Sequence, residues 1–415
     1  MKPNKWPSEY LHNPKPDKTV EEMWDILDGY TFEEQFEQPH LHDKINFVIP
    51  LPPLKYNGQM VKGMFFSQAV DTIVERFPRI KEIFIPIANS MFTSYPASEH
   101  ADCLFVCYNN EDRMKYYKEK YPEKKDKILI PLQDADFLNE YEMAPTFNTL
   151  KTLDVFCCMT PYPFKNLPML ARALKIYEKK FCYRLKVKCA LGIPDIKKNP
   201  DGSLDYSGLR DDLQNQLRMV DDILMDTPKY IDFVPYIDHR SLAHEYTSAR
   251  CCVLSSILEG KNRFIQEAMS CNTPVIVFKD FNKFARGTYP AFLGNSGEYV
   301  PHFSDVALAD TIRKVLNNPH VYEPRRSYLK HYGRKNFINK CLDTIPYYRE
   351  NLPEYVKCGA MDNLWLDLAM QANYQLSFYD FLYGKNFMIQ TLRGMESIEK
   401  IVNFFYSRFG IKEDK

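Results

Sequence analysis

Short runs of apolar residues alternate with segments of helical periodicity along the first third of the chain. The apolar runs predict buried strands at 44–51, 80–87, 101–109 and 127–132. Apolar residues at helical spacing predict helices at 20–30, 60–77 and 111–121. Strands and helices in alternation favour an α/β fold in which helices cover a parallel sheet.

The same alternation restarts after a connector, residues 133–151, that lacks clear periodicity. It predicts strands at 153–159, 183–192, 230–237, 250–256 and 273–278. It predicts helices at 167–181, 207–225, 241–249, 263–271 and 307–318. The chain therefore reads as two α/β units with a cleft between them, and ligands of such folds bind outside the carboxyl ends of the parallel strands.

These patterns divide the chain into four parts. Residues 1–40 form a polar extension punctuated by proline, and 41–145 form a short N-terminal domain. Residues 146–350 form a larger C-terminal domain, and 351–415 form a helical segment rich in aromatic residues. Each of the two domains repeats the strand–helix alternation, so each is expected to be an α/β unit.

The composition is that of a folded protein and argues against functions that depend on bulk charge. Apolar residues make up 45% of the 415 positions and charged residues 26%, close to average usage. The chain has 54 basic and 54 acidic residues, so its net charge attracts neither nucleic acid nor an anionic membrane. We therefore expect no nucleic-acid partner.

The cysteines and the longest apolar runs bear on location. No run approaches the roughly 18 apolar residues of a membrane-spanning helix, and the first 18 residues lack the apolar core of a secretory signal. The 11 cysteines lie mostly in strand-like runs, and no two have the C-x-x-C spacing. We therefore expect reduced core cysteines, no transmembrane segment and a cytoplasmic location.

Residues 251–278 are the richest in candidate chemistry, and they predict a strand, a loop, a short helix and a second strand. Asn262 or the residues before it can cap the helix, whose first-turn N–H groups then form an anion site. Lys261 and Arg263 add two positive charges at the same point. Such a site suits the diphosphate of a nucleotide.

Two carboxylates flank this point. Glu259 lies in the loop and Glu267 lies about one turn inside the helix, eight residues later. Glu259 is a candidate for binding sugar hydroxyls, and Glu267 for binding the diol of a ribose. The alternative is a surface loop and an amphipathic helix with ordinary charges, since two glutamates at any given spacing are common in a chain with 54 acidic residues.

The segment EGKNRFIQEAMSCNTPVIV, which begins at Glu259, resembles the E-x7-E segment of the GT-B retaining glycosyltransferases of family 4. The positions that keep the family pattern are Glu259, Gly260, Glu267, Ala268, Met269, Pro274, Val275 and Ile276. The chain departs from the pattern where the family has glycine, at Asn262 and Asn272.

Other segments resemble the same family, in the family's order. Residues 127–139 are similar to the turn that closes the N-terminal domain, and 161–174 to the segment that opens the C-terminal domain. The family's phosphate-contacting lysine maps onto Lys165. The resemblance covers about residues 127–320 and implies the GT-B fold. In that fold two Rossmann-like domains face a cleft, and the C-terminal helices pack back on the N-terminal domain.

Three departures from the family concern the sugar and phosphate contacts. Thr160 stands where the family often has arginine, and the Gly-Gly of the first loop is reduced to Asn57-Gly58. Gly58 is a candidate for close backbone approach to the donor, the alternative being a plain Asn-Gly turn. The short N-terminal domain leaves His100 as the nearest candidate for the family's sugar-contacting histidine, the alternative being an exposed or core histidine.

A rival metal chemistry rests on one tripeptide. Asp134 and Asp136 form a D-x-D sequence after a predicted strand, and such carboxylates hold Mg²⁺ or Mn²⁺ on a donor diphosphate in other glycosyltransferases. A polar interdomain turn is the simpler interpretation, because the Glu259 segment already supplies a cationic diphosphate site. We therefore expect no metal and no other cofactor.

The resemblance implies a retaining glycosyltransferase that transfers a sugar from a nucleotide-diphosphate sugar to a glycan or small hydroxyl acceptor. The expected catalytic residues are Lys165, Arg263 and Glu259. The expected donor-binding residues are Gly58, Gly260, Lys261, Asn262 and Glu267. Two alternatives stay open, namely a nucleotide-sugar epimerase or related transferase on the same fold, and a non-catalytic binding protein that keeps the GT-B fold.

Overall fold

The computed structural model describes the greater part of the chain. The described residues are 44–51, 53–56, 59–67, 69–90, 98–106, 118–119, 122, 126–131, 138, 140, 142–200, 203–227, 229–257, 262–279, 295–352 and 390–412. They divide into two compact units, each with its own six-stranded sheet. Unit 1 takes in the described residues between Gln133 and Gly333, and unit 2 those up to Leu132 and from Arg334 onward. The domain boundaries expected from the sequence remain predictions.

The sheet of unit 1 is parallel throughout, with the strand order β12-β9-β8-β13-β14-β15. Its strands are β8 (Leu153–Cys158), β9 (Val187–Ala190), β12 (Ile231–Val234), β13 (Ala249–Val253), β14 (Val275–Phe278) and β15 (Gly297–Val300). A two-stranded hairpin, β10 (Lys197–Lys198) with β11 (Leu204–Asp205), stands beside it. The predicted α/β class is confirmed.

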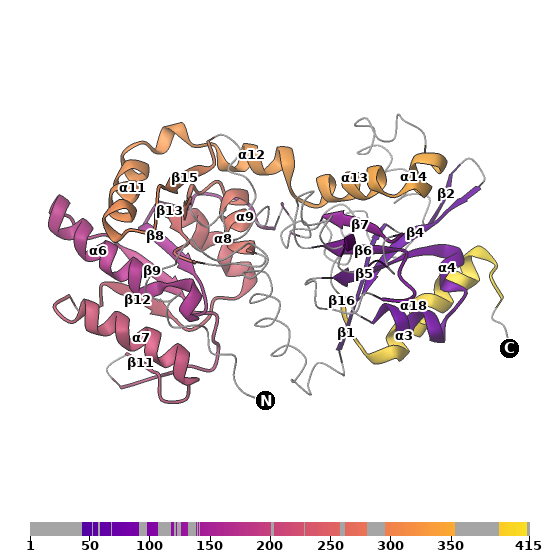
Figure 1. The fold of residues 1–415 in the computed structure, drawn as a ribbon, viewed down its shortest axis with the longest axis horizontal. Helices are drawn as coiled ribbons and strands as arrows, with labels where there is room; N and C mark the ends of the chain where they lie inside the picture. Colours follow the sequence, from indigo (N-terminus) through magenta and orange to yellow (C-terminus); the bar gives the residue numbers. More distant parts are fainter. Residues whose placement is uncertain are drawn as a thin grey trace. The chain divides into compact units, whose positions relative to one another are not determined.

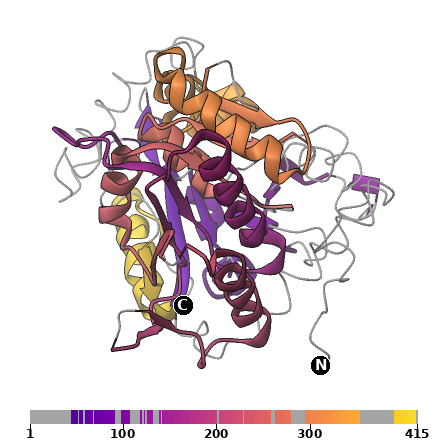
Figure 2. The same cartoon turned by 90° about the vertical axis from the view of Figure 1, so that its left-hand side faces the viewer.

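Helices cover both faces of this sheet (Figure 1). One layer holds α6 (Leu167–Phe181), α7 (Asp211–Leu224) and α11 (Asp305–Asn317), with α6 packed against the other two. In Figure 2 this layer faces the viewer. The other layer holds α8 (His239–Ser248), α9 (Arg263–Ser270) and α12 (Pro324–His331), with α9 packed against the other two. Short 3-10 turns occur at η4 (Pro163–Lys165) and η5 (Pro319–Val321).

The central strands of unit 1 are buried on both faces, which explains their cysteines. In β13, four of the five side chains are buried, including Cys251 and Cys252. Burial raises the pKa of the Cys251 thiol to about 12 and that of Cys252 well above its ordinary value. These thiols stay protonated and serve as small apolar core residues. The predicted reading of Cys251 and Cys252 as core cysteines is confirmed.

The strand order of unit 1 reverses between β8 and β13. From β8 the chain adds β9 and β12 on one side, and from β13 it adds β14 and β15 on the other. In open α/β sheets the crevice outside the carboxyl ends of two such strands is where ligands bind. The loops that follow β8 and β13 are therefore where the fold positions a site.

The sheet of unit 2 has the order β16-β1-β4-β5-β6-β7. Its strands are β1 (Lys44–Leu51), β4 (Gly63–Ser67), β5 (Phe84–Ser90), β6 (Cys103–Val106), β7 (Ile128–Pro131) and β16 (Gln390–Arg393). Strands β4 to β7 are parallel, whereas β1 is antiparallel to both β4 and β16. A hairpin of β2 (Leu54–Tyr56) and β3 (Gln59–Val61) follows β1.

The helices of unit 2 come from both ends of its sequence. They are α3 (Val70–Arg76), α4 (Ile80–Ile83), α13 (Arg334–Thr344), α14 (Pro346–Asn351) and α18 (Gly394–Phe409). Ile398, Val402 and Phe405 of α18 are buried in the same core as β1 and β4. Phe405 meets Phe84 edge-on, with ring centroids 5.1 Å apart.

Two predictions for unit 2 are wrong in part. The helix predicted at 60–77 is helical only in α3, and its first half forms β3 and β4. All five side chains of β4 are buried, and a contiguous apolar run in a central strand is easily mistaken for a helical face. The strand predicted at 80–87 begins with the one-turn helix α4. The helix predicted at 20–30, and most of the one at 111–121, lie outside the described residues.

Candidate functional site

The loops after β8 and β13 are joined by two hydrogen bonds. The main-chain N–H of Ile257 donates to the carbonyl of Phe164 at 2.7 Å. The hydroxyl of Ser255 donates to the carbonyl of Lys165 at 2.7 Å. The loop that leads toward the Glu259 segment therefore fixes the backbone at Lys165, as expected for two loops at the switch point of the sheet.

The Lys165 side chain lies at one end of a stack of two aromatic rings that has a cation at each end. Its ammonium lies 5.2 Å from the centroid of the Phe164 ring. Phe164 stacks on Tyr162 with ring centroids 5.4 Å apart and planes 7° from parallel. The guanidinium of Arg210 lies 5.3 Å from the Tyr162 centroid. Cation–π attraction at each end favours one orientation of these side chains and so of the Lys165 ammonium.

An asparagine flanks helix α9 at each end, Asn262 before it and Asn272 after it. The Asn262 side chain accepts a hydrogen bond from the N–H of Ile265 at 3.2 Å, so the predicted cap is confirmed. Asn272, just after the helix, has φ of 59°, a conformation that glycine adopts freely and asparagine tolerates. This conformation explains why asparagine can stand at a position where the E-x7-E pattern that the segment resembles has glycine.

Glu267 is 5% exposed and has polar neighbours on both carboxylate oxygens. The hydroxyl of Tyr246, on α8, donates to its Oε2 at 2.8 Å. Its Oε1 lies 3.4 Å from Nε of Arg263 and 3.9 Å from Nε2 of His239. Burial, and then the Glu267 charge, raise the pKa of Tyr246 well above its ordinary value, so the hydroxyl stays protonated. One oxygen is thus held inside the protein, and the other faces the two basic side chains.

The charged groups around Cys158, the last residue of β8, show which of the predicted site residues lie close together. Burial and the Glu267 charge raise the pKa of its thiol, Lys165 and Arg263 lower it, and the net result is a pKa of about 12. Three charged groups, one from the η4 turn and two from α9, therefore act on one thiol. Of the predicted site residues, the structure brings together Lys165, Arg263 and Glu267, with Asn262 as the cap of the same helix.

The remaining predicted residues are not seen at this site. Gly58, Glu259, Gly260 and Lys261 lie outside the described residues, as do Asp134 and Asp136. Their roles stay predictions. Within the described ranges, no three His, Cys, Asp or Glu side chains are grouped as metal ligands. None of the helices that the structure describes is long and apolar enough to cross a membrane.

His100 and Thr160 lie in local structural contacts. The His100 imidazole lies 3.7 Å from an exposed carboxylate oxygen of Glu75, and its main-chain N–H donates to Asp71 at 2.9 Å. The hydroxyl of Thr160, two residues after β8, packs close to Gly192, which has φ of 67°. The sugar-contacting role of His100 stays a prediction.

Sequence reasoning missed Tyr246, His239 and Cys158. Tyr246 packs edge-on against Phe156 with ring centroids 5.2 Å apart, and its spacing in the sequence is that of an ordinary core residue. A signal was present nonetheless, because a glutamate at a buried helix position needs a hydrogen-bond donor. Which neighbouring helix supplies that donor is set by tertiary packing.

Replacing Tyr246 with phenylalanine is expected to lower the free energy of unfolding by about 2 kcal/mol. The ring packing is kept, but Oε2 of Glu267 loses its buried donor. Urea denaturation measures the change. The matched control is Tyr183→Phe, whose hydroxyl meets Asp154 at 3.3 Å on a side chain that is 46% exposed. Equal stability of the two variants would contradict the assigned contact.

Comparison with known proteins places a family match on this part of unit 1. Residues 225–336 match the family model described as glycosyl transferases group 1. That range includes α8, α9 and α12, and with them Tyr246, Arg263 and Glu267. Comparison with curated proteins gives no match.

Several solved structures are similar at low identity. Sucrose-phosphate synthase from Thermosynechococcus elongatus is 20% identical, with a TM-score of 0.44 over 67% of this chain and 70% of that one. A glycosyltransferase from Rickettsia africae is 14% identical, with a TM-score of 0.46 over 68% and 74%. The pneumococcal O-GlcNAc transferase GtfA, solved with UDP and GlcNAc, is 13% identical, with a TM-score of 0.44 over 66% of this chain and 54% of that one. The segment 225–336, which carries part of the candidate site, is thus the part of the chain that is similar to the group 1 glycosyl transferases.

Proposed function

We propose that the protein is a glycosyltransferase that moves a sugar from a nucleotide-diphosphate sugar to a hydroxyl of a glycan or a small acceptor. The observation that carries this proposal is the gathering of Lys165, Arg263 and Glu267 at the switch point of a parallel sheet. The family match over residues 225–336 supports the same class of reaction.

The two cations suit the chemistry of the leaving group. When the bond between the sugar C1 and the diphosphate oxygen breaks, negative charge develops on the nucleoside diphosphate. Cations held in place before the reaction stabilise that charge in the transition state. In this proposal Lys165 and Arg263 supply them, with Lys261 and the first-turn N–H groups of α9.

The carboxylates then bind the two sugars of the donor. Glu259 accepts hydrogen bonds from the transferred sugar, and Oε1 of Glu267 accepts one from a ribose hydroxyl. Because Tyr246 already donates to Oε2, Glu267 offers the ribose one oxygen rather than two. Gly58 and Gly260 allow close approach of the backbone to the donor.

Transfer proceeds with retention and without a metal in this proposal. The acceptor oxygen attacks C1 on the face from which the diphosphate departs, and its proton passes to the departing phosphate oxygen. No protein nucleophile is assigned. Nuclear magnetic resonance of the product, with the anomeric configuration compared with that of the donor, tests retention directly.

A thermal-shift panel is the first test of donor binding. The full chain is heated with UDP, GDP, ADP, CMP and their sugars, with and without Mg²⁺. A ligand at 100 times its dissociation constant stabilises a protein by about 2.7 kcal/mol, and we expect a metal-independent shift with one nucleotide family.

The other outcomes of the panel decide against parts of the proposal. A shift that requires Mg²⁺ overturns metal independence and directs attention to Asp134 and Asp136. Binding without turnover on any acceptor favours a non-catalytic binding protein, and an isomerised donor sugar favours an epimerase. No shift with any nucleotide overturns the donor site itself.

A further inference from the structure

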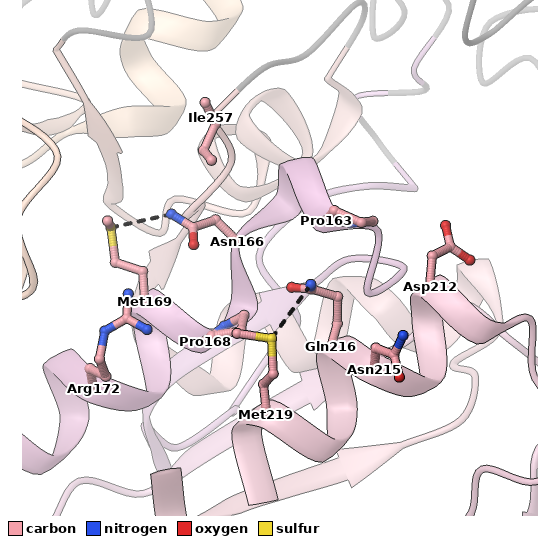
Figure 3. Close-up of a pocket in the computed structure, with 10 residues that line it drawn as sticks. All are labelled: Pro163, Asn166, Pro168, Met169, Arg172, Asp212, Asn215, Gln216, Met219 and Ile257. Atoms are coloured by element: carbon pink, nitrogen blue, oxygen red, sulfur yellow. Dashed lines mark hydrogen bonds between the residues drawn. The ribbon is translucent and has the colours of Figure 1, made fainter. Parts of the chain in front are cut away.

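Unit 1 contains a pocket of about 420 Å³ where the first turns of α6 and α7 meet the η4 turn (Figure 3). Its lining residues are Pro163, Asn166, Pro168, Met169, Arg172, Asp212, Asn215, Gln216, Met219 and Ile257. The volume falls within the range of about 300 to 1,000 Å³ that is typical of small-molecule sites. None of the residues proposed above to bind the diphosphate or the ribose is among them.

The charged residues of the pocket are already paired. Nε of Arg172 lies 2.7 Å from Oδ2 of Asp305, and Nε of Arg210 lies 2.6 Å from Oδ1 of Asp212. Each ion pair cancels the charge that it brings to the lining. A ligand that carried a net charge would find no opposite charge to offset the loss of its hydration, so the pocket favours an uncharged ligand.

Two buried amides line the pocket and have weak partners. Asn166 is 6% exposed and Gln216 is 7% exposed. The NH₂ group of Asn166 donates to the sulfur of Met169 at 3.4 Å, and that of Gln216 to the sulfur of Met219 at 3.9 Å. Across the described part of the chain these are the only hydrogen bonds of either side chain. A thioether is a weak acceptor, and buried amides normally have stronger partners; an occupant of the pocket would supply them.

The kinds of side chain in the lining limit which class of ligand can bind. Proline, methionine and isoleucine side chains give it aliphatic walls, and no lining residue is aromatic. Nucleobases are commonly held by stacking on aromatic rings, which this pocket does not offer. Sugar hydroxyls both donate and accept, and so match the two amides and Asn215 at the same time. We propose that this pocket binds a small uncharged saccharide.

This saccharide site is lined by other residues than those of the proposed donor site. The pocket is lined by residues at the starts of α6 and α7 and by Ile257 of the loop after β13. Arg263 and Glu267 lie on α9, a helix of the layer on the other face of the sheet (Figure 1). Pro163 and Asn166 of the pocket stand on either side of Lys165 along the chain. A bound saccharide therefore contacts the loop that carries Lys165, and its binding does not depend on the proposed function.

The test is a binding titration of the full chain with glucose, galactose, mannose, N-acetylglucosamine and maltose. Ligand-observed nuclear magnetic resonance and calorimetry measure the affinity. We expect one of these saccharides to bind the wild-type protein, and Gln216→Met and Asn215→Ala each to weaken it by about tenfold, the effect of losing one hydrogen bond. Gln216→Met conserves the side-chain volume at a buried position, and Asn215 is an exposed residue. Both variants should therefore fold.

The matched control is Arg218→Ala, an exposed position on the same helix that does not line the pocket; it should bind the saccharide as the wild type does. The proposal is overturned if no saccharide binds at tens of millimolar, or if both pocket variants bind as the control does. Binding of uridine or adenosine that Gln216→Met abolishes also overturns it, in favour of a nucleoside site. The nucleotide panel, repeated on Gln216→Met, reports the donor site separately.

Discussion

Turnover is expected to fall by about 10²- to 10³-fold when Lys165 is replaced with alanine, the loss typical of removing one group that stabilises transition-state charge. The Lys165 ammonium is fixed over Phe164 at 5.2 Å, and its backbone carbonyl accepts from Ser255. The backbone contact survives the substitution, so the fold should too. Initial rates with saturating donor, together with the melting temperature, measure the two effects.

A lysine on the neighbouring helix supplies the control. Lys175, on α6, pairs with an exposed Asp226 at 3.3 Å, and exposed pairs contribute little to stability. Lys175→Ala should leave turnover and melting temperature unchanged. A Lys165→Ala variant as active as Lys175→Ala would remove Lys165 from the mechanism.

Replacing Gly297 with alanine is expected to destabilise unit 1 by about 3 kcal/mol, the upper range of overpacking effects. A Cβ built on this residue of β15 lies 1.9 Å from the Val275 carbonyl oxygen and 2.8 Å from its carbonyl carbon. The clashing atoms belong to the backbone of β14, a buried strand that pairs with β15. They therefore cannot move away from the added Cβ. For a unit of this size the melting temperature should fall by roughly 6 to 12 °C.

Gly208 gives the matched comparison, because no atom lies within 4 Å of a Cβ built there. Gly208→Ala should have the same melting temperature as the wild type. Differential scanning calorimetry on both variants decides the point, and a Gly297→Ala protein as stable as Gly208→Ala would show that β14 and β15 are not packed as described.

The sequence predicted unit 1 more successfully than unit 2, for a physical reason. Helix α6 spans the predicted residues 167–181, because its apolar stripe is regular and proline stands at its start. The strands of its parallel sheet are buried on both faces and appear as plain apolar runs. In unit 2, β16 was missed within a segment read as helical, since four residues whose pairing partner is β1 carry little local signal.

The candidate site, too, could be predicted from the sequence only in part. The cap at Asn262 and the position of Lys165 follow from local sequence, because both depend on neighbouring residues along the chain. The Tyr246 hydroxyl on Glu267 depends on how α8 packs against α9. The amides of the further pocket depend likewise on how α6 meets α7, and no pattern along a single segment contains that information.

The interleaved sequence of unit 2 sets the order in which the molecule can be completed during synthesis. The described part of unit 1 comes from one stretch that ends at Gly333, so its whole sheet leaves the ribosome before β16 is made. Until then β1 lacks one neighbour and presents an unpaired edge, the kind of surface on which nascent chains pair wrongly. The last strand of the described chain thus completes a sheet that was begun more than 300 residues earlier, and β1 stays an edge strand until that strand has been made.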